Sequence, residues 1–212
     1  MRKIIICFLL LVSPVIWART DSIKVFQGCS GGMMLHTGYL FGQDPNAPQD
    51  ATGVPYSPQG ATFGIGGVMR VHLLNHLRIG AEGFMSTMNR STTDCRQRLQ
   101  SGSYIRTGWG GLCMDACWRK EKVWPYIGGT IGGGAMRALY LMEGDEKDWQ
   151  EEQHAVFHKR PFFYVDPYIG LDWCMKKRVH MTFRLDWLLA IHQQALVMPT
   201  GPRLYIGFMF CH

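Results

Sequence analysis

The chain has 212 residues, 47% of them hydrophobic, and a formal net charge of +6. No basic run exceeds three residues, and the small cationic excess argues against a nucleic-acid-binding protein. The 25 glycines lie largely within apolar runs, and no apolar stripe of helical period has a useful length, so the composition favours strands over helices.

The N-terminal stretch MRKIIICFLLLVSPVIWA has the pattern of a secretory signal peptide. Arg2 and Lys3 precede an apolar run, and a small residue stands at Ala18. The run is too short for a spanning helix, which needs about 20 apolar residues. We expect residues 1–18 to be removed on export, residues 19–27 to form a periplasmic segment, and residues 28–212 to form a single domain.

Eight segments alternate apolar and polar residues with period two, as half-buried strands do. Each has about the length that a tilted strand needs to cross a bilayer, roughly 9–11 residues. The facing of the Gly-rich fifth segment stays undecided from the pattern alone. In chain order the segments are 33–41, 62–73, 77–86, 111–118, 124–138, 163–173, 180–190 and 203–210.

The connections between these segments alternate in length. Long polar stretches follow the first, third, fifth and seventh segments, whereas short turns follow the second, fourth and sixth, at LNHL, RKEKV and KKR. The long stretches are 42–60, 89–102, 142–160 and 190–202. This separation predicts an all-β fold, an eight-stranded antiparallel up-and-down transmembrane barrel with its long loops outside the cell.

The charged face of the strands is predicted to line the lumen. All eight lysines fall outside the segments, and the charges within them are Arg, Asp, Glu and His, which suit compact buried pairing. An eight-stranded barrel is filled by its own side chains, so these charges must pair. We expect the first six of the following near the periplasmic ends of their strands, and Asp166 nearer the outer end: Arg70, His72, Arg78, Glu82, Asp115, Asp172, Asp166, Arg184 and Asp186.

The C-terminal YIGFMFCH carries a resemblance to a known family. Tyr205, Gly207 and Phe210 match the assembly signal of outer-membrane barrels, although His212 replaces the usual terminal aromatic residue. Residues 28–212 resemble the small eight-stranded outer-membrane barrels of Gram-negative bacteria, the type of OmpX and the OmpA membrane domain. The resemblance implies an outer-membrane location, contact with lipid, and insertion by the barrel assembly machinery. It implies no cofactor.

Two pairs of residues that contain histidine allow other functions, a catalytic pair and a metal site. His180 and Thr182 are similar to the His-x-Ser pair of outer-membrane lipid A deacylases, but they begin a strand at the periplasmic end. His154 and His158 would bind Zn²⁺ beside Glu151 if the acidic loop formed a helical turn, whereas solvated loop histidines are commoner.

Six cysteines follow the signal segment, and the oxidising compartment allows disulfides without requiring them in a chain of this size. Cys29 and Cys211 lie near the seam between the first and last strands, where a disulfide could form.

The lumen charges allow two interpretations, a structural ion-pair plug or a path for protons or solutes. The plug leaves the long outer loops as the place for function, because exposed loops on a rigid scaffold usually carry binding. We therefore expect a structural or surface-binding protein with an extracellular ligand for its loops. A small channel, and less favourably a lipid A-modifying enzyme, are the alternatives.

Overall fold

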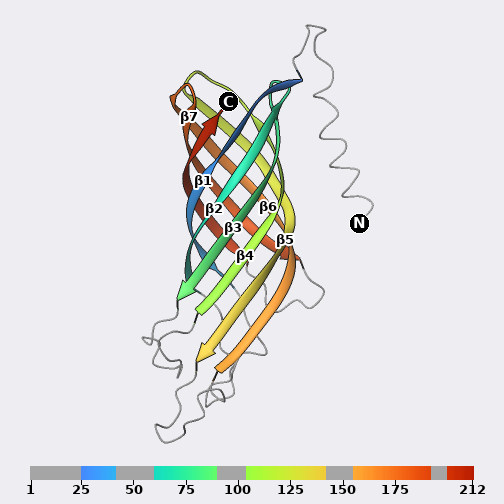
Figure 1. The fold of residues 1–212 in the computed structure, drawn as a ribbon, viewed down its shortest axis with the longest axis vertical. Helices are drawn as coiled ribbons and strands as arrows, with labels where there is room; N and C mark the ends of the chain where they lie inside the picture. The colour runs from blue at the N-terminus through green and yellow to red at the C-terminus, as the bar shows by residue number, and fades with distance from the viewer. Residues whose placement is uncertain (1–24, 42–59, 90–103, 142–154, 192–199) are drawn as a thin grey trace, which may run out of the picture.

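The computed structural model describes residues 25–41, 60–89, 104–141, 155–191 and 200–212, and these form a closed antiparallel barrel (Figure 1). Every strand pairs with its neighbours in sequence, and β1 pairs with β8 to close the ring. The predicted eight-stranded up-and-down barrel is therefore confirmed. Its strands are β1 (Phe26–Leu40), β2 (Gly60–Leu73), β3 (Leu77–Asn89), β4 (Tyr104–Cys117), β5 (Val123–Leu141), β6 (Ala155–Lys176), β7 (Val179–Ile191) and β8 (Gly201–Cys211).

Burial alternates along the strands because successive side chains point to opposite faces of a sheet. Met69 is 67% exposed on the outer face, whereas Arg184 is 1% exposed in the lumen. Phe183, Ile206 and Phe210 are also exposed outward, as the sequence predicts. The charged face is thus the inner face of the barrel, and the apolar face is the outer one.

The outer face is apolar around the ring and carries aromatic side chains near both ends, as in barrels that cross a bilayer. Tyr39, Phe41, Phe163 and Trp187 are exposed toward one end, and Phe26, Trp118, Trp173 and Phe210 toward the other. No helix long and apolar enough to cross a membrane occurs in the part of the chain that the structure describes.

The two ends of the barrel differ in their connections (Figure 1). At the turn end lie the short connections β2–β3, β4–β5 and β6–β7 together with the C terminus. At the other end β1, β3, β5 and β7 finish, and the segments 42–59, 90–103, 142–154 and 192–199 begin. We call this the long-segment end. The predicted separation of short and long connections is confirmed, whereas the signal peptide lies outside the described residues.

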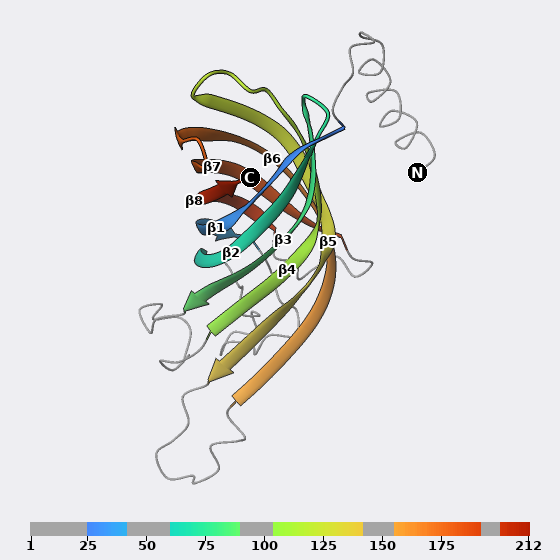
Figure 2. The ribbon, with the colours of Figure 1, turned by 45° about the horizontal axis from the view of Figure 1, so that its top comes forward.

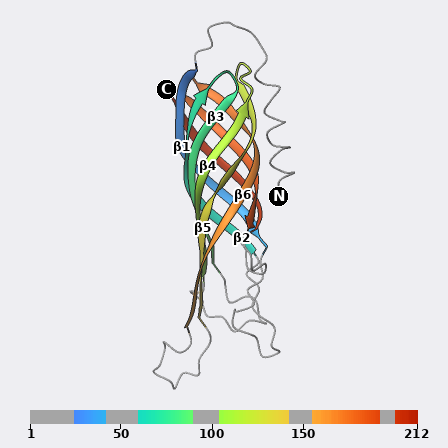
Figure 3. The same ribbon diagram turned by 90° about the vertical axis from the view of Figure 1, so that its right-hand side faces the viewer.

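The hairpin of β5 and β6 is longer than the rest of the barrel and projects beyond the other strands at the long-segment end (Figures 2 and 3). Its pairing reaches Leu141 and Ala155, whereas β6 pairs with β7 only as far as Phe163 and Ile191. The prediction of a loop over 142–160 was therefore wrong for residues 155–160, which extend β6. Val156 and Phe157 are β-branched and aromatic, residue types that favour strands.

Glycines on the inner face make room for large polar side chains. A Cβ at Gly170 would collide with the Tyr126 ring, and a Cβ at Gly128 would collide with Asp115. The Gly-rich β5 has a defined facing, with Tyr126 and Thr130 buried in the lumen.

Candidate functional site

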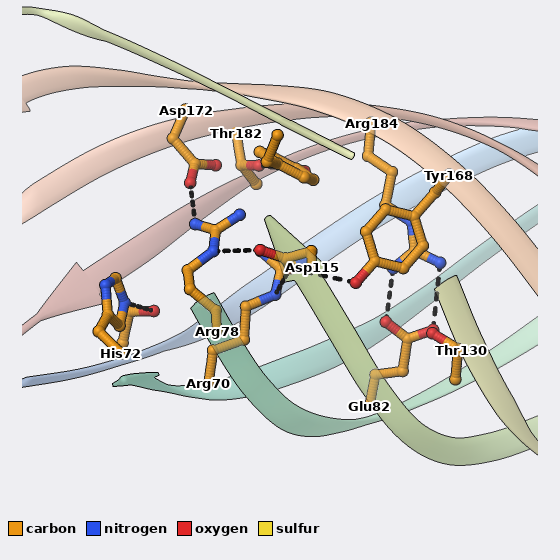
Figure 4. Close-up of polar contacts among 12 residues, drawn as sticks. Arg70, His72, Arg78, Glu82, Asp115, Thr130, Tyr168, Asp172, Thr182 and Arg184 are labelled. Carbon is orange, nitrogen blue, oxygen red and sulfur yellow. Dashed lines mark hydrogen bonds and ion pairs between the residues drawn. The ribbon is translucent and has the colours of Figure 1, made fainter. Parts of the chain in front are cut away.

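The lumen holds two layers of buried ion pairs, which strand alternation places on the inner face (Figure 4). In the first layer, Arg78 of β3 donates through Nε to Asp115 at 2.5 Å and through Nη1 to Asp172 at 2.6 Å. Arg70 of β2 lies 3.1 Å from the second oxygen of Asp115. The four side chains are at most 4% exposed, so two cations and two anions neutralise each other out of solvent.

In the second layer, Arg184 of β7 is shared by three carboxylates. Its Nη1 and Nη2 donate to both oxygens of Glu82, at 2.5 and 3.1 Å. Its Nη2 also donates to Asp166 and to Asp186, each at 2.9 Å. All four side chains have no exposed area. Because charge-assisted and bidentate hydrogen bonds are the strongest ones, this layer ties β3, β6 and β7 across the lumen.

Tyr168 of β6 connects the two layers. The Arg184 guanidinium lies over the Tyr168 ring at 4.0 Å from its centroid, and the Tyr168 hydroxyl donates to Asp115 at 3.1 Å. Tyr126 extends the same packing, with the Arg78 guanidinium 4.5 Å from its ring centroid. The aromatic faces stabilise the buried guanidinium groups and exclude water from them.

The predicted lumen residues are all buried. Glu82 and Asp166 both belong to the second layer with Arg184, which lies farther from the turn end than the first layer. His72 contacts Ser30 and Arg119, both at 2.9 Å, and not a carboxylate, so it lies outside the predicted ion-pair network. Tilted strands bring residues from different register positions to one height, which alternation alone does not reveal.

Neutral side chains that are not among the predicted lumen charges complete the network. Thr130 donates to Glu82 at 2.8 Å, and the Tyr126 hydroxyl lies 3.1 Å from that of Thr182. Alternation already placed Tyr168 on the inner face. These neutral partners could therefore have been identified from alternation, by including every large polar side chain on the inner face and not only the charged ones.

Beyond the second layer, toward the long-segment end, the lumen is lined by aromatic rings. His36 contacts the rings of Phe84, Trp109 and Tyr205 with centroids 4.9 to 5.9 Å apart. The Arg203 guanidinium lies 4.1 Å from the Trp109 ring centroid. Several buried polar atoms here have no hydrogen-bond partner among the described residues: His36 Nδ1, Ser86 Oγ, Trp109 Nε1 and the Tyr164 hydroxyl.

His180 and Thr182 both lie on the inner face of β7 near the turn end. His180 packs edge-on against Trp124 at 4.6 Å and contacts the Cys211 thiol at 3.5 Å, whereas Thr182 bonds to Tyr126. The two side chains thus have separate partners near the turn end.

The zinc and disulfide alternatives, which the sequence allowed without favouring them, find no support among the described residues. Residue 158 lies in β6 opposite Ala138, so it is not in a helical turn, and His154 lies outside the described residues. Within the described ranges, no group of three or more His, Cys, Asp or Glu side chains could hold a metal ion. Cys29 is exposed outward and Cys211 faces the lumen, and both thiols are free.

The residues of the predicted assembly signal lie on both faces of β8. Tyr205 is fully buried in the lumen beside Arg184, and Phe210 is 55% exposed on the outer face. Gly207 pairs with Thr182 of β7 and Met34 of β1, so the signal lies in the strand that closes the ring.

Comparisons with known proteins agree with this architecture. No family model and no curated protein matches the chain. Among solved structures, it is similar to Ail, the attachment invasion locus protein of Yersinia pestis, in complex with the heparin analogue sucrose octasulfate. That match has 11% identity and a TM-score of 0.53, and it covers 88% of this chain and 99% of the other. Neisserial surface protein A is similar at 10% identity and a TM-score of 0.55, covering 86% and 96%.

At these identities the likeness concerns the fold alone. Both neighbours are small outer-membrane barrels, and the outer face described above is apolar between two sets of aromatic side chains. The chain has the closed eight-stranded antiparallel barrel fold of these proteins, and its apolar outer face suits a barrel that crosses a bilayer.

Proposed function

We propose that this protein is a non-conducting surface protein of a Gram-negative outer membrane, with its long-segment end outside the cell. The observation that carries the proposal is the closed lumen. Arg78 and Arg184 each bridge carboxylates from different strands, and the ion-paired side chains are at most 4% exposed. A barrel filled in this way serves as a rigid scaffold, so we place its function in the segments exposed at its ends.

The long-segment end is the proposed binding surface. It carries the projecting β5–β6 hairpin, and the segment 142–154 between these strands contains six carboxylates and one lysine. Exposed connections on a rigid scaffold are where binding residues concentrate. A strongly acidic segment fits a basic partner, because opposite charges steer association.

Retention of whole cells on polylysine-coated surfaces tests this proposal. A variant in which a short Asn-Gly turn replaces residues 142–154 keeps the Leu141–Ala155 pairing and removes the acidic segment. We expect cells with the parent protein to be retained more strongly than cells with the variant at low salt. Equal retention at equal surface amounts of the two proteins would contradict the proposed binding surface.

A small channel is the second candidate. The buried polar atoms without a protein partner at His36, Ser86, Trp109 and Tyr164 favour a hydrated lumen beyond the second layer. Conduction would still require a path past Arg184 and Arg78.

We propose no enzymatic role. The separate hydrogen-bond partners of His180 and Thr182 support this proposal against lipid A modification. Mass spectrometry of lipid A with and without the gene is expected to show the same acyl pattern. A pattern that changes with the gene, and that the His180→Ala variant cannot restore, would overturn this view.

Insertion by the barrel assembly machinery is the remaining proposed partnership. Tyr205, Gly207 and Phe210 lie on the strand that closes the ring, where an assembly factor would act last. We expect Phe210→Ala to lower the amount of protein in the outer membrane, whereas Phe208→Ala, equally outward on the same strand, should lower it less.

A further inference from the structure

The ladder between β6 and β7 is interrupted in the middle of the barrel wall. Tyr168 pairs with Asp186 and Val165 pairs with Leu189, but no pair joins Asp166 or Pro167 to β7. Pro167 has no amide hydrogen to donate, and Pro202 of β8, which lies opposite Trp187, has none either. Prolines on both neighbouring strands therefore flank one short stretch of β7.

A groove opens on the outer face at this interruption. It is an open depression with a volume of about 390 Å³. Its walls are Ile127, Pro167, Ile169, Leu185, Trp187 and Pro202. Its floor is formed at Gly128, Tyr168 and Asp186, residues on the inner face of their strands. We call this the proline groove.

Leu185 is the central residue of β7 (Val179–Ile191), so the proline groove lies near mid-height of the barrel wall, with Trp187 on its side toward the long-segment end. Trp187 stacks on Phe41 with ring centroids 6.5 Å apart, and Phe41 pairs with Thr200 just before β8 begins. The wall residues Ile127, Ile169, Leu185 and Trp187 are about half exposed, so the groove faces the apolar phase around the barrel.

We propose that the proline groove is a lipid-binding site that holds one hydrocarbon chain of a membrane lipid. A second copy of the chain fits less well, because a stable protein interface takes about 20–30 residues from each side and the groove has nine. An apolar chain matches both the apolar walls and the surrounding phase. The site is independent of what the long segments bind.

Gly129 provides a way to fill the groove from outside. It lies opposite Pro167 on the outward face of β5, and a Cβ there would meet only the Asp166 carbonyl oxygen at 3.5 Å and the Pro167 Cα at 3.9 Å. Gly133 is a matched control on the same face of the same strand, where a Cβ would meet the Phe162 carbonyl oxygen at 3.6 Å. Leucine at either position therefore avoids a backbone collision.

The test uses the full chain refolded in liposomes that contain phosphatidylethanolamine with a diazirine on its acyl chain. After illumination, mass spectrometry maps the labelled residues. We expect labelling of Ile169, Leu185 and Trp187 to exceed, several-fold, labelling of Met69 and Leu112, although these two are more exposed. Gly129→Leu should lower groove labelling several-fold, and Gly133→Leu should leave it unchanged.

Three results would overturn the site. In the first, the labelling yield of each residue follows its exposed fraction alone. In the second, Gly129→Leu and Gly133→Leu lower groove labelling equally. In the third, the groove residues are cross-linked to a second protein copy and not to lipid. Heat-modifiable gel migration of each variant verifies that its barrel is folded before labelling. A failure of surface binding would leave these outcomes unaffected, because the test involves none of the long segments.

Discussion

Arg184 illustrates how a single residue holds the barrel interior together. Its guanidinium is fully enclosed and bonded to Glu82, Asp166 and Asp186, with the Tyr168 ring against its face. Burying these charges costs desolvation energy that is offset only while all partners remain. The layer therefore contributes more to a defined structure than to net stability.

Removing this cation should be strongly destabilising. We expect Arg184→Ala to lower the free energy of unfolding by about 3–5 kcal/mol, because it leaves three buried carboxylates without their cation. Urea unfolding of the refolded protein in detergent measures the loss. The control Arg106→Ala removes an exposed guanidinium that lies over Tyr104 and should change stability by less than about 0.5 kcal/mol. Equal effects of the two variants would contradict an enclosed layer whose carboxylates depend on Arg184.

Gly170 makes room for the Tyr126 ring, and its replacement should be costly. Gly170→Ala would place a methyl group within the ring, so we expect a lower yield of folded barrel and a lower urea midpoint. Tyr126→Ala in the same chain should restore part of the yield. Gly133→Ala, outward on β5, should behave like the parent protein. A fully stable Gly170→Ala protein would show that the lumen is looser than the structure describes.

Alternation in the sequence predicted which charged side chains enter the lumen but not which ones pair. Arg184 and Asp186 are assigned inward from a pattern of period two alone. That Glu82 of β3 contacts Arg184 of β7 depends on strand tilt and ring closure, which no local pattern encodes. Alternation places Tyr168 on the inner face, but its contact with Asp115 again depends on strand tilt and ring closure.

At the level of strands, the sequence pattern located all eight strands but underestimated the length of several. β1 begins at Phe26 and β4 at Tyr104, ahead of the predicted segments 33–41 and 111–118. The short turns were placed correctly because alternation stops abruptly there. The β5–β6 hairpin was underestimated, since residues 155–160 (AVFHKR) show no alternation of apolar and polar residues and have β5 as their partner on one side. In that hairpin, pairing with β5 forms a strand that alternation does not reveal.

The interruption between β6 and β7 should be visible in hydrogen exchange. Neighbouring amides on a strand point to opposite sides, so one of Trp187 and Leu188 directs its N–H toward β6, where no pair exists. We expect that amide to exchange faster than those of Phe183 and Arg184, which lie in a continuous ladder. Equal protection across these four amides would contradict an open ladder.

As a whole, the molecule has a polar inside and an apolar outside, the inverse of a barrel that dissolves in water. Purified protein should therefore need detergent, show a β circular dichroism spectrum, and migrate faster on gels before boiling than after. A helical spectrum, or a protein that stays dissolved and folded without detergent, would contradict the transmembrane barrel.

The scaffold role depends on a lumen that two ion-pair layers close. Planar-bilayer recording of the full chain measures this most directly, since any continuous water path would carry current. We expect little or no steady conductance from the parent protein, and rare openings at most after Arg184→Ala removes the centre of the second layer. Large, reproducible conductance steps in the parent protein, altered by Arg184→Ala, would contradict the closed lumen and identify the protein as a small channel.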